Sequence, residues 1–330
     1  MGGAGFELVE TVLATVERHG MLAAGDAVVV AVSGGADSTC LLDVLARASG
    51  RLDLALAVAH VDHGLSEASE EVAARVARTA AAAGFDVHVA RAAGLAGPNL
   101  QARAREFRYG FLATVAGRLG AARIATGHTL DDRVETTLAR LVHGAGTEGL
   151  AGIPPVEGAR VRPLIDLRRA ETRAYCERRE LEFVDDPAND DPRFERVVVR
   201  RRLVSAIEEH WGDGAVRSVA ASAQRLREDA EALAVLAERV CSDLGTTSGQ
   251  GLELEIEALL ALPRALRRRV LERAVGRVRD RAGGIEAALE ALERPRDRTL
   301  RFAVASGIEI SVSSDRLRVE RPTGSVSGGH

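Results

Sequence analysis

The amino-acid sequence predicts an α/β protein with a doubly wound parallel sheet and a second, smaller, mostly helical α+β domain at the C-terminus. Short apolar runs rich in β-branched residues alternate with longer segments of helical periodicity over the first two thirds of the chain. Such alternation predicts a parallel sheet with helices on both faces. Polar stretches directly follow three of the four predicted strands, and ligands of these sheets bind beyond the carboxyl ends of the strands.

The first domain is expected to span residues 1–210. Its first strand is the valine-rich run 27–33, and the other predicted strands share its apolar character. They lie at 54–60, 85–90 and 122–126. The segments with apolar residues at helical spacing are 38–49, 67–84, 100–119 and 130–142.

The second domain is expected to span residues 211–330. It begins with a predicted helical linker at 214–243 and continues, after the break "GTTSGQG", into an arginine-rich helix within 264–281. Three strand-like runs follow, "LRFAVA", "IEISVS" and "RLRVER". The Gly- and Ser-rich tail 322–330 is expected to be disordered.

The composition limits the classes of function. With 330 residues, 46% of them hydrophobic, the chain can bury the cores of two domains. It has no apolar run of membrane-spanning length and no basic-then-apolar leader, so we expect a cytoplasmic protein without a membrane partner. The net charge of −4 argues against a general polyanion binder, although all 44 basic residues are arginine. Cys40, Cys176 and Cys241 are far apart in sequence, which excludes a CxxC metal site and predicts isolated thiols.

The stretch "SGGADS" (33–38) follows the first predicted strand and indicates a phosphate loop without lysine. Its glycines allow close approach of the backbone to an anion, and Ser33, Ser38 and the N–H groups of the next helix can hold that anion. Asp37 cannot bind an anion, so it is expected to hold Mg²⁺ or to accept a hydrogen bond within the loop. The alternative is a tight strand-to-helix turn with a serine cap.

Two further strand ends carry histidine and carboxylate side chains. In "AHVDHGLS" (59–66), His60, Asp62 and His63 make half a metal site, and a hydrogen-bonded polar loop is the favoured alternative. In "ATGHTLDDRVETTLARL" (125–141), Asp132 is three residues from Thr129, as in a capping box. His128, Asp132 and Glu135 fall on one helical face, which suits either Mg²⁺ coordination or the capture and deprotonation of an amine.

The remaining motifs are a glycine loop and two arginine pairs. "GAGTEG" (144–149) follows a helix rather than a strand, so we interpret it as a flexible, substrate-facing loop and not as a dinucleotide fingerprint. Arg105 and Arg108 share a helical face, and Arg108 is a candidate phosphate ligand. Arg196 and Arg200 also share a face, which indicates either a solvated helix or contacts with RNA phosphates.

Taken in order, these segments resemble the tRNA(Ile)-lysidine synthase family, within the N-type ATP pyrophosphatases with a PP-loop. The resemblance covers roughly the first 205 residues. The matching segments are 33–38, "HVDHGLS" (60–66), "AREFRY" (104–109), "GHTLDDRVET" (127–136), "HGAGTEGL" (143–150), "RPLIDLRRAETRAY" (162–175) and "DDPAND" with "RVVVR" (185–200). His143 and Val197 stand where the family usually has arginine and asparagine, and Ser66 replaces a common arginine.

The resemblance implies an ATP-dependent ligation. ATP would adenylate the C2 oxygen of the wobble cytidine, position 34, in the isoleucine tRNA with a CAU anticodon. Free L-lysine would then attack C2, giving lysidine, AMP and pyrophosphate and changing the codon read from AUG to AUA. The implied cofactors are ATP and Mg²⁺, and a homodimer is compatible with the sequence.

The resemblance also implies a set of site residues. The expected ATP ligands are Ser33, Gly34, Gly35, Ala36, Asp37, Ser38, His60 and Gly127, with Asp37 on Mg²⁺. The expected catalytic residues are Asp37, Arg108, His128, Asp132 and Glu135. The expected tRNA contacts are Arg196, Arg200, Arg268, Arg269 and Arg273.

Several other functions are open from the sequence. A tRNA thiolase would need a suitable cysteine pair, which the sequence does not provide, and GMP, NAD and asparagine synthetases share the loop but not the later motifs. A metal-dependent hydrolase could use the residues His60, Asp62, His63, His128 and Asp132. A nucleotide-binding regulatory module would bind ATP without turnover.

Overall fold

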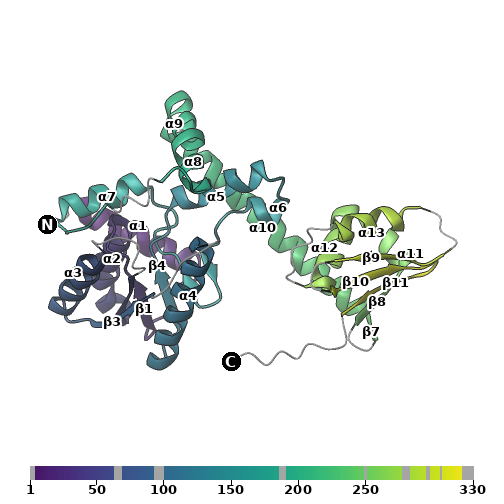
Figure 1. The fold of residues 1–330 in the computed structure, drawn as a ribbon, viewed down its shortest axis with the longest axis horizontal. Helices are drawn as coiled ribbons and strands as arrows, with labels where there is room; N and C mark the ends of the chain where they lie inside the picture. Colours follow the sequence, from purple (N-terminus) through teal and green to yellow (C-terminus); the bar gives the residue numbers. More distant parts are fainter. Residues whose placement is uncertain are drawn as a thin grey trace. The chain divides into compact units, whose positions relative to one another are not determined.

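The computed structural model describes residues 4–62, 69–92, 100–185, 191–248, 251–276, 283–294, 298–304 and 307–321. The chain divides into two compact units, Met1–Leu226 and Arg227–His330 (Figure 1). The division falls inside helix α10 (Asp213–Leu244), later than the predicted boundary after residue 210. The predicted tail 322–330 lies outside the described residues.

The first unit contains a six-stranded sheet with the order β3-β2-β1-β4-β6-β5. Its strands are β1 (Ala27–Ala31), β2 (Ala55–Asp62), β3 (Asp86–Arg91), β4 (Arg123–Thr126), β5 (Val156–Glu157) and β6 (Arg160–Val161). All neighbours pair in parallel except the edge strand β5, which is antiparallel to β6. The predicted parallel sheet is therefore confirmed, and the two short strands at its edge are additional.

The described residues of the first unit also form a series of helices. They are α1 (Ala4–Arg18), α2 (Ala36–Leu52), α3 (Ser69–Ala82), α4 (Leu100–Leu119), α5 (Leu130–Val142), α6 (Thr147–Leu150), α7 (Arg169–Arg178), α8 (Glu195–Val198), the π-helix η2 (Val199–Val204) and α9 (Ser205–Trp211). Val28 and Val30 of β1 pack with α1 and α2, whereas Val29 packs with α4. Burial on both faces explains why β1 is an unbroken valine run rather than an alternating strand.

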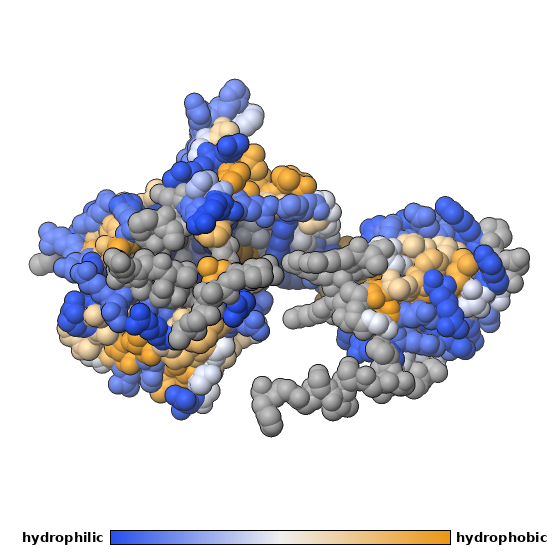
Figure 2. Space-filling view, viewed as in Figure 1, coloured by the Kyte–Doolittle hydropathy of each residue, from blue (hydrophilic) through white to orange (hydrophobic). Residues whose placement is uncertain are grey.

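Part of the surface of the first unit is apolar. Leu141 and Val142 at the end of α5 are exposed, and Figure 2 shows hydrophobic surface beside α5 and α6.

The predicted flexible loop 144–149 is partly helical, because α6 begins at Thr147 and Arg140 donates to the Gly149 carbonyl at 2.9 Å.

All three cysteines are free thiols, as predicted, but two of them are neighbours. Cys40 of α2 and Cys176 of α7 are both buried in the same core cluster. The neighbouring Cys176 thiol, together with burial, raises the pKa of Cys40. The Cys176 thiol donates to the carbonyl of Ala36 at 3.3 Å. The packing of α7 on the first turn of α2 brings the two thiols together.

The second unit contains a five-stranded antiparallel sheet with the order β7-β8-β11-β10-β9. Its elements are β7 (Thr246–Ser248), β8 (Gly251–Glu255), α11 (Ile256–Leu260), α12 (Arg264–Val275), α13 (Gly284–Leu292), β9 (Leu300–Ala303), β10 (Glu309–Val312) and β11 (Arg316–Glu320). The predicted break at 245–251 thus contains β7 and the first residue of β8, and these two strands pair with each other. Within the described residues, no helix is both long and apolar enough to span a membrane.

Candidate functional site

The loop between β1 and α2 is closed by its two serines. The Ser33 N–H donates to Ser38 Oγ at 3.1 Å, the two Oγ atoms are 3.1 Å apart, and Ser38 Oγ donates to the Gly35 carbonyl at 3.0 Å. Gly35 is the N-cap of α2. Because the first N–H groups of a helix lack partners within the helix, this turn presents donors for an anion.

Two glycines allow the loop to pack closely. Gly34 has φ of 91°, and a Cβ atom there would lie 2.7 Å from Val72 Cγ1. Gly127 follows β4, and a Cβ atom there would lie 3.1–3.2 Å from the backbone of Asp37 and Ser38. The ends of β1 and β4 therefore meet at this loop, as expected for neighbouring parallel strands.

His60, near the end of β2, contacts the backbone just before the loop. Its Nδ1 is 2.8 Å from the Val32 carbonyl, and burial lowers the pKa of the imidazole. This geometry favours the hydrogen-bonded loop over the half metal site, and the predicted contact of His60 with ATP stays a prediction. His63 lies outside the described residues. In the described part of the chain, no group of three or more histidine, cysteine and acidic side chains is placed to hold a metal ion.

Asp132 and Glu135 of α5 are buried and lie on one face, as the helical spacing predicts. The prediction was wrong for His128, because the helix begins at Leu130 after the N-cap Thr129. Asp132 Oδ2 accepts the Thr129 N–H at 2.8 Å, and its Oδ1 accepts Arg169 Nη2 at 2.7 Å. Glu135 accepts Arg169 Nη1 at 3.0 Å, Arg196 Nε at 2.6 Å and Arg200 Nε at 2.7 Å. A further hydrogen bond joins Arg196 to Asp132.

Asp37 belongs to the same charge cluster. Arg169 Nε lies 3.5 Å from Asp37 Oδ2, and the Thr172 hydroxyl donates to Asp37 Oδ1. Burial raises the pKa of Asp37, although Thr172 and Arg169 oppose that shift. The guanidinium of Arg169 thus contacts the loop carboxylate and two carboxylates of α5, those of Asp132 and Glu135.

Arg169 and Thr172 were not among the predicted site residues. Both lie on α7, and the stretch "RPLIDLRRAETRAY" (162–175), which runs into this helix, contributes to the family resemblance without a role assigned to either residue. The α7 N-terminus is fixed by two hydrogen bonds. The Arg168 N–H donates to Glu171 Oε2 and the Arg169 N–H to Asp131 Oδ2, each at 2.7 Å.

His128 lies in an arginine-rich environment. Its Nδ1 is 2.9 Å from Thr126 Oγ1. Burial and the positive charges of nearby arginines hold the pKa of His128 well below its usual value, so the imidazole is neutral at pH 7. Those arginines are Arg162, Arg196, Arg105 and Arg108. Burial also lowers the pKa of Arg108. A neutral imidazole among cations suits a bound phosphate or adenylate.

The arginines predicted to contact tRNA are all paired with carboxylates. Arg196 and Arg200 contact Glu135. On α12, Arg268 pairs with Glu286 at 3.0 Å, Arg269 with Glu272 at 2.9 Å, and Arg273 with Glu238. To contact RNA phosphates, these arginines would have to give up their carboxylate partners. Their contact with tRNA stays a prediction.

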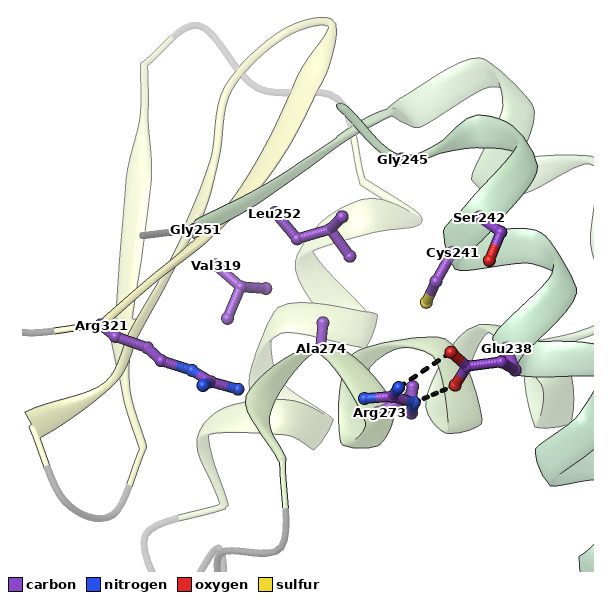
Figure 3. Close-up of a pocket in the computed structure, with 10 residues that line it drawn as sticks. All are labelled: Glu238, Cys241, Ser242, Gly245, Gly251, Leu252, Arg273, Ala274, Val319 and Arg321. Carbon is purple, nitrogen blue, oxygen red and sulfur yellow. Dashed lines mark hydrogen bonds and ion pairs between the residues drawn. The ribbon is translucent and has the colours of Figure 1, made fainter. Parts of the chain in front are cut away.

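The Arg273–Glu238 pair borders a pocket of about 400 Å³ in the second unit. Figure 3 shows this pair on one side of the pocket and Arg321 on another. The pocket lies between the end of α10, α12 and the strands β8 and β11.

Comparisons with known proteins agree on the family. A family model described as "PP-loop domain" matches residues 9–207. The tRNA(Ile)-lysidine synthase of Symbiobacterium thermophilum is 38% identical over 95% of this chain and 69% of its own length. The enzymes of that name from Leifsonia xyli and Methylobacterium nodulans are each 40% identical, over 76% and 86% of this chain and 76% and 84% of their own lengths.

The chain belongs to the tRNA(Ile)-lysidine synthase family. It is therefore a ligase that uses a PP-loop domain to modify the wobble position of a tRNA, and binding of ATP follows from the domain. The predicted fold and family are confirmed. The hydrolase and regulatory-module alternatives are set aside.

A solved structure supports the fold as well. The U34-tRNA thiolase NcsA from Methanococcus maripaludis superposes with a TM-score of 0.56, covering 67% of this chain and 78% of its own. At 18% identity, this likeness concerns the fold alone.

Two residues at which this family member departs from the common pattern have structural partners. His143 Nε2 lies 2.5 Å from Glu195 Oε1, which connects the end of α5 to α8. Val197 is buried, so its side chain serves packing rather than recognition.

Replacing Gly127 by alanine in this family member is expected to lower the free energy of unfolding by about 1–3 kcal/mol, because backbone atoms of Asp37 and Ser38 obstruct the new Cβ. The displaced loop should also bind ATP more weakly. Denaturant unfolding and calorimetric ATP titration measure both effects. The matched control is Gly50→Ala on α2, where nothing lies within 4 Å and a gain of up to about 1 kcal/mol is expected. Equal stability of the two variants would contradict the close contact.

Proposed function

We propose that this chain ligates free L-lysine to C2 of the wobble cytidine, position 34, of the isoleucine tRNA with a CAU anticodon. The reaction passes through an adenylated cytidine and yields lysidine, AMP and pyrophosphate, which changes the codon read from AUG to AUA. The observation that carries the proposal is the meeting of Asp37, Asp132 and Glu135 around Arg169. This meeting supports an amine-binding role for the Asp132 and Glu135 pair beside the phosphate loop.

The loop supplies the binding of the nucleotide phosphates. The turn after β1 has N–H groups and hydroxyls that suit the departing pyrophosphate. Its residues in this role are Ser33, Gly34, Gly35, Ala36 and Ser38. The positive end of the α2 dipole also favours negative charge there. No lysine side chain is required for this binding.

Asp37 fits a role as ligand of Mg²⁺. Its Oδ2 lies 3.5 Å from Arg169 Nε, and Mg²⁺ commonly takes one or two carboxylates together with substrate phosphates. When bound, the ion would neutralise charge on the leaving pyrophosphate. Thr172, through its hydrogen bond to Oδ1, fixes the orientation of the carboxylate.

Arg108 and His128 are the residues that we propose to assist adenylation. Arg108 carries positive charge into a partly buried environment, where it can stabilise charge on the α-phosphate. The neutral imidazole of His128 can hydrogen-bond the adenylate without adding charge.

Asp132 and Glu135 are the proposed acceptors of the lysine ε-amine. That amine has a pKa of about 10.4 and arrives protonated, so it needs a carboxylate to bind it and a base to take its proton. Three arginines now compensate these carboxylates. Displacement of one guanidinium by the ammonium group would free an acceptor and increase the basicity of the carboxylate.

The arginines of both units complete the proposal. They would exchange their carboxylate partners for tRNA phosphates and so fix the register of the tRNA. These residues are Arg196, Arg200, Arg268, Arg269 and Arg273.

We place the reaction in the cytoplasm, where tRNA, ATP and lysine are available, and a homodimer is one arrangement of the enzyme.

The test is incubation of the protein with ATP, Mg²⁺, labelled lysine and CAU-anticodon isoleucine tRNA. Label should enter this tRNA, with one AMP and one pyrophosphate for each lysine incorporated, and should not enter a methionine tRNA with the same anticodon. Release of ADP and orthophosphate, or equal labelling of both tRNAs, would contradict the proposal.

A further inference from the structure

Resting on the proposed function, we infer that Arg169 is a positioning residue for the step in which lysine is captured. Its guanidinium holds Asp132 and Glu135 in fixed relation to Asp37, and it stays in place when lysine binds. The cation that the incoming ammonium displaces is Arg196.

The contacts of Arg169 use every nitrogen of its guanidinium. Nη2 donates to Asp132 at 2.7 Å, Nη1 donates to Glu135 at 3.0 Å, and Nε lies 3.5 Å from Asp37. These carboxylates come from α2 and α5, whereas the arginine comes from α7. A planar guanidinium with donors in fixed directions can set the geometry of all three, which a point charge cannot do.

The backbone of Arg169 is itself anchored. Its N–H donates to Asp131 Oδ2 at 2.7 Å, and its carbonyl oxygen lies 2.8 Å from Thr172 Oγ1. Asp131 is held in turn by Arg168, whose Nε lies 3.1 and 3.2 Å from the two carboxylate oxygens. Burial alone would raise the pKa of Asp131, but these hydrogen bonds lower it, so Asp131 remains a charged anchor.

The acceptor capacity of the two α5 carboxylates is almost fully used. Asp132 accepts the Thr129 N–H, Arg169 and Arg196, and Glu135 accepts Arg169, Arg196 and Arg200. Since a carboxylate offers about four lone-pair sites, an ammonium with three donors must displace a guanidinium. The side chain of Arg196 is 49% exposed, against 29% for Arg169 and 27% for Arg200. Arg196 is therefore the one with room to leave.

Loss of Arg169 would have an effect that depends on the substrate. The carboxylates of Asp132 and Glu135 would lose their common partner and their fixed spacing, so lysine would bind less well. The phosphate loop would retain its serine and glycine contacts, and Asp37 would retain Thr172. Removal of Arg169 should thus affect lysine more than ATP.

The experiment compares Arg169→Ala and Arg169→Lys with Arg173→Ala, one turn further along α7. Arg173 is exposed and pairs with Asp185 and Glu177, away from the cluster. Lysine incorporation into the CAU-anticodon isoleucine tRNA is measured with the full chain, and KM is determined separately for lysine and for ATP. Thermal unfolding shows whether each variant is folded.

For Arg169→Ala we expect the KM for lysine to rise by about tenfold or more, because one or two charge-assisted hydrogen bonds are lost. The KM for ATP should change less than about threefold. Arg169→Lys should recover only part of the loss, and added guanidinium ion should rescue Arg169→Ala but not alter Arg173→Ala. A merely structural role predicts equal changes in both KM values and no rescue.

An unchanged KM for lysine in Arg169→Ala would overturn the inference while leaving the proposed function intact. Failure of the wild-type chain to incorporate lysine would instead overturn the proposed function. If Arg169→Ala does not fold, Arg169→Lys provides the same comparison, because it keeps the positive charge.

Discussion

Replacing Asp37 by asparagine is expected to slow adenylation by about 100- to 1,000-fold, the usual cost of removing one group that stabilises charge in the transition state. Asparagine has the same shape, and its carbonyl can still accept the Thr172 hydroxyl. What it loses is the negative charge that would hold the metal beside the leaving pyrophosphate. Pyrophosphate release, measured with ATP and the CAU-anticodon tRNA, follows this step.

A close match for this variant exists on the same helix. Asp43 also lies on α2 and accepts a hydroxyl from α7, that of Tyr175 at 2.5 Å. Asp43→Asn removes a comparable charge with a comparable partner, but away from the loop. Pyrophosphate release should therefore fall far less than in Asp37→Asn, and similar losses in the two variants would mean that Asp37 acts only through the packing of α2 on α7.

Replacing Glu135 by glutamine is expected to reduce lysine incorporation by about 100- to 10,000-fold, the range for loss of a general base. The side chain of Glu135 is 1% exposed and contacts three arginines. Leaving those charges without it should also lower the free energy of unfolding by about 3–5 kcal/mol. Denaturant unfolding and lysine incorporation are measured on the same preparation.

Two controls separate these effects. Glu177→Gln removes an exposed carboxylate paired with Arg173, and it should change stability by less than about 1 kcal/mol. In the double variant Glu135→Gln with Arg200→Gln, stability should recover in part because one of the uncompensated cations is gone, whereas activity should not. Recovery of lysine incorporation together with stability would show that Glu135 has no chemical role.

Local patterns in the sequence predicted much of this fold. The helices expected at 100–119 and 130–142 coincide with α4 and α5. Apolar periodicity identifies such elements because it reflects burial of one face. The same periodicity placed Asp132 and Glu135 together. The edge strands β5 and β6 are two residues each, too short to produce a pattern.

The partners of those residues could not be found in this way. Arg169 and Thr172 reach the site because α7 packs on α2, and the same packing makes Cys40 and Cys176 neighbours. Arg196 and Arg200 share a helical face, as expected, but that face is turned to buried carboxylates rather than to solvent. Such pairings depend on the arrangement of whole elements, which local spacing does not encode.

The cations around Asp132 and Glu135 are all guanidinium groups, and the chain contains no lysine. A guanidinium stays protonated at any physiological pH and is a poor nucleophile. An electrophilic base held next to this cluster would therefore meet no competing side-chain amine from the protein. Chemical fidelity of the ligation would follow from the choice of cation, since the substrate would bring the sole reactive primary amine to these carboxylates.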